Sequence, residues 1–196
     1  MRDERSYKTL HEIGIENKNV KVTADPALDL DIADEKLGKA ILKNEGVPSD
    51  KKLLGVSVRK WQNLGGDFET QIANACDYAY EKYGYYTVFL PMQSSRDTAI
   101  MQNIKRKMKH ESAIIKKRYS VEGMLSIIKC FDMCIGMRLH TLIYAAINSV
   151  PLIGLVYDPK INSFMEYTHQ RHYVDVNEVT AVSYTHLRAH ETRRHL

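Results

Sequence analysis

The run from Cys134 to Ala146, CIGMRLHTLIYAA, holds the residues best suited to chemistry in this chain of 196 residues. An apolar segment predicted as a buried strand ends at Met137, and a predicted helix begins within two or three residues. Arg138 and His140 lie at that turn. Arginine can grip a carboxylate or phosphate with two parallel hydrogen bonds, and histidine can donate, accept or transfer a proton. The local pattern is equally compatible with an anion site and with a surface ion pair beside a helix cap.

Other polar side chains follow predicted strands in the same way. They are Arg2 at the start of the chain, Arg59 after LGVSV, Gln93 after FLPM, and Asp158 and Lys160 in VYDPK. Arg2 could face the same crevice or lie in a solvated first helical turn. Gln93 could bind a sugar hydroxyl or only close a loop. Asp158 could accept a proton or hydroxyl of a ligand, or only stabilise a turn.

Short apolar runs alternate with amphipathic stretches along the chain, and this alternation sets the predicted fold class. Strands are predicted over Val20–Thr23, Leu53–Val58, Thr87–Leu90, Ala113–Ile115, Met133–Met137 and Leu152–Tyr157. Helices are predicted over Glu4–Ile13, Glu35–Asn44, Phe68–Lys82, Asp97–Lys109, Val121–Phe131 and Leu139–Ile147, with Ser120 as an N-cap. The pattern predicts a Rossmann-like α/β domain with an open, mostly parallel sheet. Such sheets bind ligands beyond the carboxyl ends of their strands, where the candidate residues are expected.

Composition excludes several classes of protein. Hydrophobic residues make up 44% and charged residues 27%, which is typical of a globular domain. No apolar run reaches the ~18 residues of a membrane span, and the first ten residues are too polar for a signal peptide. Three cysteines are too few for a disulfide scaffold, and Cys130 and Cys134 are interpreted as core thiols rather than metal ligands. The sequence contains no phosphate-binding glycine loop, zinc-protease motif or serine-hydrolase elbow, and no metal site is expected.

The last fifteen residues look foreign to the rest. Residues 182–196 resemble the translation of a sequencing-library adapter, so we expect an artefactual tail. The whole chain has 28 basic and 24 acidic side chains, a net charge of +4; without the tail, 25 and 23 remain, a net charge of +2. So small a charge makes a nucleic-acid partner unexpected.

Six segments resemble the polysaccharide pyruvyl transferase family, and they occur in the family's order. They are Met1–Tyr7, TADPALDL at Thr23–Leu30, LGVSVRKW at Leu54–Trp61, FLPMQ at Phe89–Gln93, IGMRLHTLIYAA at Ile135–Ala146, and PLIGLVYDPKINSFMEYT at Pro151–Thr168. The MRLH and YDPK segments are the specific ones. The greatest similarity is to the CsaB-type branch that acts on bacterial cell walls.

The resemblance implies an enzyme of two Rossmann-like halves in a glycosyltransferase B-like arrangement, of which residues 1–181 would be the C-terminal half and the N-terminal half would be missing. Such enzymes transfer the pyruvyl group of phosphoenolpyruvate, their donor substrate, to two hydroxyls of a sugar. A pyruvate ketal forms and phosphate is released, without a further cofactor. The implied acceptor is an N-acetylhexosamine of a lipid-linked cell-wall polysaccharide that anchors S-layer proteins. The implied location is the cytoplasm or the inner face of the membrane.

The resemblance also implies roles for the candidate residues. Arg138, with Leu139 beside it, would bind the anionic groups of the donor, and Arg2 would be a second anion ligand. His140 would bind phosphate or transfer a proton, and either His140 or Asp158 would serve as general base. Three more residues are expected to bind substrate: Arg59, Gln93 and Lys160.

Two other functions fit the same architecture. A nucleotide-sugar glycosyltransferase would use the crevice for a nucleoside diphosphate and would recruit Asp158 or Glu166 for the ribose. A non-catalytic polysaccharide-binding fragment would expose aromatic platforms, for which Trp61, the one tryptophan, is weak support.

Overall fold

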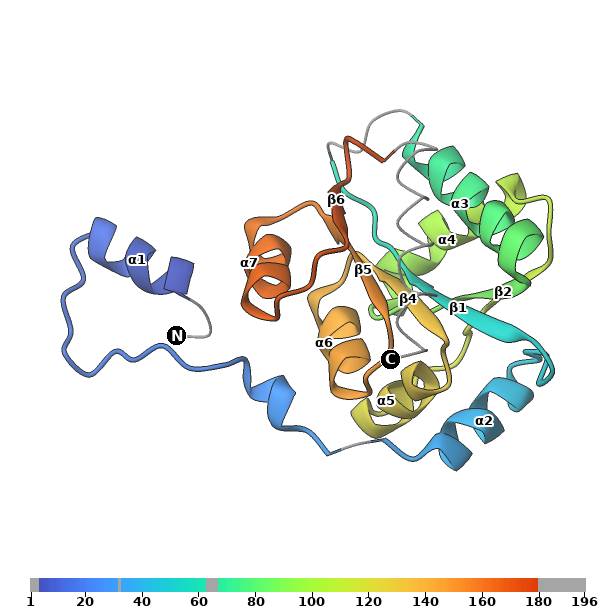
Figure 1. The fold of residues 1–196 in the computed structure, drawn as a ribbon, viewed down its shortest axis with the longest axis horizontal. Helices are drawn as coiled ribbons and strands as arrows, with labels where there is room; N and C mark the ends of the chain where they lie inside the picture. The colour runs from blue at the N-terminus through green and yellow to red at the C-terminus, as the bar shows by residue number, and fades with distance from the viewer. Residues whose placement is uncertain (1–3, 32, 63–66, 180–196) are drawn as a thin grey trace.

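A computed structural model describes residues 4–31, 33–62 and 67–179, in which six strands form one open sheet (Figure 1). All neighbouring strands are parallel, and their order is β3-β2-β1-β4-β5-β6. The strands are β1 (Lys52–Ser57), β2 (Tyr85–Phe89), β3 (Ser112–Ile114), β4 (Met133–Gly136), β5 (Leu152–Val156) and β6 (Tyr173–Asp175). The chain builds β2 and β3 on one side of β1, then reverses to build β4, β5 and β6 on the other. The crevice between the ends of β1 and β4 is therefore the topological switch point.

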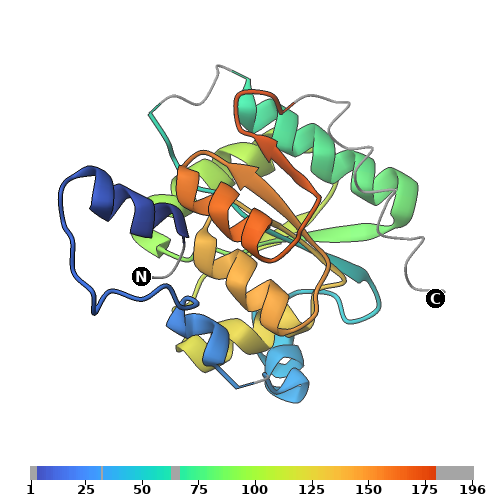
Figure 2. The same cartoon turned by 60° about the vertical axis from the view of Figure 1, so that its left-hand side comes forward.

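The helices form two layers around the sheet (Figure 2). They are α1 (Glu4–Glu12), α2 (Glu35–Asn44), α3 (Phe68–Tyr83), α4 (Ser94–Lys107), α5 (Val121–Lys129), α6 (Leu139–Ile147) and α7 (Pro159–Tyr167), with a 3-10 turn, η1 (Pro26–Asp29). Helices α2, α5, α6 and α7 pack on one face, whereas α3 and α4 pack on the other. Helix α1 buries no residue and lies at the end of an extended segment beside this body (Figure 1).

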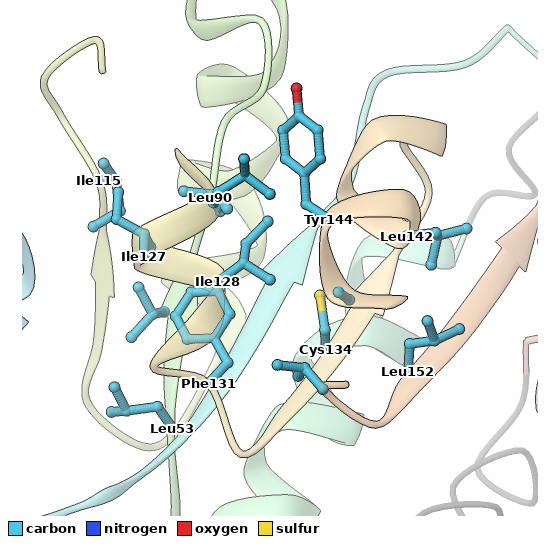
Figure 3. Close-up of a cluster of buried hydrophobic side chains, with 14 of the residues drawn as sticks. Leu53, Leu90, Ile115, Ile127, Ile128, Phe131, Cys134, Leu142, Tyr144 and Leu152 are labelled. Atoms are coloured by element: carbon cyan, nitrogen blue, oxygen red, sulfur yellow. The ribbon is translucent and has the colours of Figure 1, made fainter. Parts of the chain in front are cut away.

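Alternation along each strand divides the core between the two faces. In β1, Leu53 joins the cluster beneath α2 and α5, and Leu54 and Val56 join the cluster beneath α3 and α4. Figure 3 shows part of the first cluster, with Phe131 packed at its centre. Strands covered on both faces read as continuous apolar runs, which explains why their sequences predicted them well.

Two strand glycines let this helical layer approach the sheet closely. A Cβ on Gly55 would lie 2.1 Å from the ring of Phe131, and one on Gly136 would lie 2.6 Å from Leu142 of α6. The connection is short as well: β4 ends at Gly136, and α6 begins at Leu139 with Arg138 as its N-cap residue. The turn that carries Arg138 therefore lies directly above a tightly packed strand–helix contact.

The predicted fold class is confirmed: the domain is α/β with an open parallel sheet. Five predicted strands and six predicted helices correspond to observed elements to within about three residues, and Ser120 caps α5 by accepting the Gly123 N–H. The predicted strand Val20–Thr23 is wrong, because that segment pairs with no strand among the described residues. Strand β6, α7 and η1 were not predicted. The tail 182–196 lies outside the described residues.

Within the described ranges, no helix has the length and apolarity needed to cross a membrane. Cys134 lies fully inside the core, where burial raises the pKa of its thiol to about 12. Cys130 packs against the same core and donates to the carbonyl of Ser126 at 3.4 Å. Burial likewise raises the pKa of Cys130, to about 11. Both are structural thiols.

Candidate functional site

Arg138 follows β4 and is clamped by a buried carboxylate. Its Nη2 forms an ion pair with Asp97 Oδ1, and its Nε donates to Asp97 Oδ2 at 3.2 Å. Nη2 also donates to Gln93 Oε1 at 3.3 Å. Among the described residues, Nη1 of Arg138 has no hydrogen-bond partner, and the side chain is 16% exposed. The guanidinium is therefore fixed along one edge and keeps a terminal nitrogen available to a ligand.

Asp97 is the residue that makes this arrangement rigid. It lies in the first turn of α4, has no exposed surface, and accepts the Gln93 N–H at 2.9 Å in addition to the Arg138 bonds. A buried carboxylate is tolerated only when it is paired and hydrogen-bonded, and both conditions hold here. Asp97 thus orients Arg138 and the Gln93 loop together.

A second arginine at the same edge is held by aromatic rings. Arg59 follows β1, and its Cζ lies 5.4 Å from the ring centre of Trp61 and 5.3 Å from that of Tyr157. Its Nη1 donates to the Tyr157 hydroxyl at 3.2 Å. The two rings contact each other edge to face at 4.7 Å. Lys160 Nζ lies 5.3 Å from the Tyr157 ring centre, so Tyr157 faces two cations.

The two arginines cross at the switch point. Arg138 leaves β4 and reaches past the end of β1 to Asp97, in the helix after β2. Arg59 leaves β1 and reaches past the end of β4 to Tyr157, which follows β5. The backbone N–H of Arg59 also donates to the sulfur of Met137 at 3.4 Å, which joins the two turns. Positive charge is therefore concentrated where parallel sheets bind anions.

Asp158 and Lys160 belong to a helix start, where a turn was expected. Asp158 is the N-cap of α7 and accepts the Lys160 N–H at 3.0 Å, and Pro159 occupies the first helical position. The Lys160 ammonium lies 3.4 Å from the second carboxylate oxygen of Asp158. The sequence left open whether Asp158 acts on a ligand or stabilises a turn. In the structure it stabilises the first turn of α7.

His140 and Leu139 occupy opposite environments on α6. The ring of His140 is exposed and lies 6.1 Å from that of Tyr144. Leu139 is buried and lines, together with Lys160, a small pocket of about 20 Å³ between η1, α6 and α7. That volume has room for about one water molecule, so it is too small for a substrate.

Five of the predicted site residues form two groups, and Leu139 and His140 belong to neither. Arg138 and Gln93 come together through Asp97, and Arg59, Asp158 and Lys160 come together around Tyr157. Arg2 lies outside the described residues. Asp97 and Tyr157 were not predicted as site residues. Their signal in the sequence is position alone, because Asp97 lies in the first turn of the helix after β2 and Tyr157 directly follows β5.

The sequence model of the polysaccharide pyruvyl transferase family matches residues 1–159. No curated protein matches the sequence significantly.

Three of the solved structures with similar folds share 11–16% identity with this chain. UDP-GlcNAc 2-epimerase of Methanocaldococcus jannaschii, in complex with UDP-GlcNAc and UDP, superposes with a TM-score of 0.69 at 16% identity, covering 100% of this chain and 53% of the epimerase. The S. aureus MnaA–UDP structure gives a TM-score of 0.69 at 12% identity, with coverage of 98% and 51%. E. coli ADP-heptose LPS heptosyltransferase II gives 0.63 at 11% identity, with coverage of 93% and 57%. The chain thus spans about half the length of these proteins, and its fold is glycosyltransferase B-like.

Proposed function

Because the chain belongs to the polysaccharide pyruvyl transferase family, we propose that it binds phosphoenolpyruvate and supplies the donor half of a reaction that forms a pyruvate ketal on a polysaccharide sugar. The observation that carries the proposal is the clamped guanidinium of Arg138, with Nη1 left without a partner among the described residues. Phosphoenolpyruvate carries a phosphate and a carboxylate, and a planar guanidinium matches either group.

The surroundings of Arg138 suit an anion. Helix α6 begins immediately after it, so the positive end of the helix dipole lies at the same turn. Arg59 adds a second cation at the switch point, from the neighbouring strand. Arg138 and Asp97 carry opposite charges that cancel. Arg59 adds one positive charge, so these three side chains together are positively charged. These features support binding of the donor between the two arginines.

The proposed reaction conserves atoms and charge in two additions. A proton adds to the C3 methylene of phosphoenolpyruvate, and C2 gains positive character. One sugar hydroxyl oxygen bonds to C2 and gives up its proton. The bond from C2 to the phosphate oxygen then breaks, and a second hydroxyl bonds to C2 and also loses its proton. The products are the ketal and inorganic phosphate, which takes the surplus proton. Arg138 would stabilise the negative charge that develops on the leaving phosphate.

We assign proton transfer to His140 in preference to Asp158. His140 is exposed two residues beyond Arg138, where a bound donor would reach it. One oxygen of the Asp158 carboxylate accepts the Lys160 N–H as the helix cap, and the other lies beside the Lys160 ammonium. Both oxygens therefore already have partners. Asp158 would then act on the reaction through Lys160 and Tyr157 rather than by taking a proton.

The remaining parts of the proposal concern the whole protein. The acceptor would be an N-acetylhexosamine of a lipid-linked cell-wall polysaccharide, as in the CsaB-type branch, and the cleft for it would be completed by a second Rossmann-like half. The reaction would take place in the cytoplasm or at the inner face of the membrane. It would need neither a metal nor a further cofactor.

Calorimetric titration of the chain with several ligands tests the donor class. Phosphoenolpyruvate should bind at least about tenfold more tightly than inorganic phosphate or pyruvate, because it presents both anionic groups at once. The His140→Gln variant should bind it nearly as well, since the histidine acts in the reaction. Tighter binding of UDP-GlcNAc than of phosphoenolpyruvate would favour a nucleotide-sugar glycosyltransferase, and an absence of phosphoenolpyruvate binding would refute the donor assignment.

A further inference from the structure

A pocket of about 400 Å³ lies beyond the ends of β2 and β3, and none of the reaction's proposed steps uses it. Its polar lining includes Gln93, Lys117, Arg118 and Tyr144, and its apolar lining includes Ile115 and Met124. A volume of a few hundred Å³ with mixed apolar and convergent polar walls is characteristic of small-molecule sites. The pocket is about twenty times larger than the one beside Leu139.

The loop that carries Lys117 and Arg118 is fixed by the carboxylate of Glu45. Glu45, at the end of α2, accepts the backbone N–H groups of Lys116 and Lys117 at 2.9 and 3.2 Å, and the Tyr119 hydroxyl at 2.8 Å. Partial burial works to raise the pKa of Glu45, but these three bonds and the nearby charge of Lys117 outweigh it and hold the pKa below its ordinary value. The backbone that presents Lys117 to the pocket is therefore ordered before any ligand arrives.

The Lys117 ammonium is near enough to Glu45 for their charges to attract, but it is not bonded to that carboxylate. Within the part of the chain that the structure describes, its ammonium forms no hydrogen bond and no ion pair closer than 4.0 Å. The adjacent Arg118 also lines the pocket. Two neighbouring cations on one wall favour a ligand with at least one negative charge.

Tyr144 supplies a hydrogen-bond donor to the pocket. The residue is 6% exposed and lines the pocket, and its phenolic oxygen has no hydrogen-bond partner among the described residues. Figure 3 shows its ring rising from α6 with the oxygen directed away from the buried cluster. Burial and, secondly, the charge of Asp25 raise the pKa of Tyr144, which keeps the phenol protonated as a donor. The hydroxyl itself is not enclosed by the protein, so it can donate to an acceptor atom of a ligand in the pocket.

Gln93 belongs both to the pocket and to the Arg138 site. Gln93 lines the pocket, and its Oε1 accepts a hydrogen bond from Arg138 Nη2. Tyr144 lies one helical turn after His140, at a ring separation of 6.1 Å. A molecule in the pocket would thus have one end beside the residue that we assign to proton transfer.

We propose that this pocket binds the acceptor through a phosphate or diphosphate ester on its sugar, with the ester on Lys117, Arg118 and the Tyr144 hydroxyl and the sugar toward Gln93 and His140. The identity of the ligand as acceptor rests on the proposed function. The apolar wall of Ile115 and Met124 suits the less polar face of a sugar ring or the first carbons of a lipid. The same ester chemistry occurs in free sugar phosphates, in lipid-linked sugars and in nucleotide sugars, so the test must separate them.

The test titrates the chain with N-acetylglucosamine 1-phosphate, its neutral parent sugar, a short prenyl-diphosphate-linked N-acetylglucosamine and UDP-GlcNAc. The double variant Lys117→Ala/Arg118→Ala should weaken binding of the sugar phosphate at least about tenfold, because two charge-assisted contacts are lost. Tyr144→Phe, which keeps the ring, should weaken it about threefold or more. Lys116→Ala is the matched control, an exposed neighbour outside the pocket, and should change the affinity less than about twofold.

Phosphoenolpyruvate is titrated into the same variants to separate this proposal from the donor assignment. Its affinity should stay within about twofold in all of them, since Arg138 is untouched. A chain that binds phosphoenolpyruvate but no sugar phosphate, or whose sugar-phosphate binding ignores both pocket variants, overturns the pocket proposal alone. Sugar-phosphate binding that depends on the pocket in a chain without phosphoenolpyruvate affinity supports the pocket and refutes the donor assignment. UDP-GlcNAc bound more tightly than both other esters would overturn the acceptor role.

Discussion

Arg138 and Arg59 leave adjacent strands of one sheet and cross at its switch point, yet different chemistry holds them. Arg138 is held by a carboxylate with no exposed surface, which fixes one edge of the guanidinium and leaves Nη1 without a partner in the described structure. Arg59 is held against two aromatic rings that contact each other, and it donates to the hydroxyl of one of them, Tyr157. The ion pair fixes the orientation of the Arg138 guanidinium. Contacts with the ring faces constrain the orientation of the Arg59 guanidinium less.

The contrast assigns different tasks to the two residues. A clamp by two hydrogen bonds from Nε and Nη2 orients the plane of Arg138, which is what recognition of a planar carboxylate or a phosphate needs. Contacts with ring faces leave rotation about the guanidinium less restricted. We therefore expect Arg138 to select the ligand and Arg59 to add attraction.

Breaking the clamp should have the largest effect on the fold. Asp97→Ala leaves Arg138 as a mostly buried, unpaired charge, and we expect a loss of about 3–5 kcal/mol in the free energy of unfolding. Urea denaturation measures it. Asp97→Asn is the matched variant, since it keeps the shape but not the charge. Unchanged stability in both variants would show that the pair is not structural.

Loosening the aromatic clamp should cost less. Tyr157→Phe removes only the hydroxyl that accepts the Arg59 bond, and we expect a loss of about 1 kcal/mol. Tyr157→Ala also removes the ring that faces Arg59 and Lys160, so its loss should be larger. The same denaturation measurement ranks the two variants. A Tyr157→Phe loss as large as that of Asp97→Asn would erase the proposed distinction between the two arginines.

The smallest expected effect concerns the carboxylate of Glu45, which is partly exposed where Asp97 is buried. Because its pKa is lower in the folded chain, its contribution to stability is present above the unfolded value near 4.5 and is lost as pH falls through the folded value. The stability difference between the wild type and Glu45→Gln should therefore shrink below about pH 4.5. Unfolding curves at pH 7 and at pH 3.5 provide the check. A difference that grows on acidification would contradict the assignment.

The sequence predicted the two arginines as site residues but did not predict their partners, Asp97 and Tyr157. Arg138 and Arg59 follow apolar runs, so the rule that ligands bind beyond strand ends was enough to predict them. Asp97 was invisible as a partner because nothing local indicates that a carboxylate in a first helical turn will be fully buried. Tyr157 was not predicted as a site residue because a tyrosine at the end of an apolar strand is usually interpreted as part of the hydrophobic core.

The errors in predicted elements have similarly local causes. The run Val20–Thr23 has β-branched residues but pairs with no strand in the part of the chain that the structure describes, and pairing decides whether such a run becomes a strand. Asp158 and Pro159 suggested a turn, yet an N-cap followed by proline at the first helical position uses the same residues. Strand β6 has only three residues at the edge of the sheet, which is too short for periodicity to reveal.

The most direct test of the account is to titrate phosphoenolpyruvate into the Arg138→Ala and Arg59→Ala variants side by side, with circular dichroism to show that both are folded. We predict that Arg138→Ala weakens binding about a hundredfold, as expected for losing a paired anion contact, and Arg59→Ala about threefold. The reverse order, or equal losses in the two variants, would contradict the claim that the carboxylate-clamped arginine selects the donor.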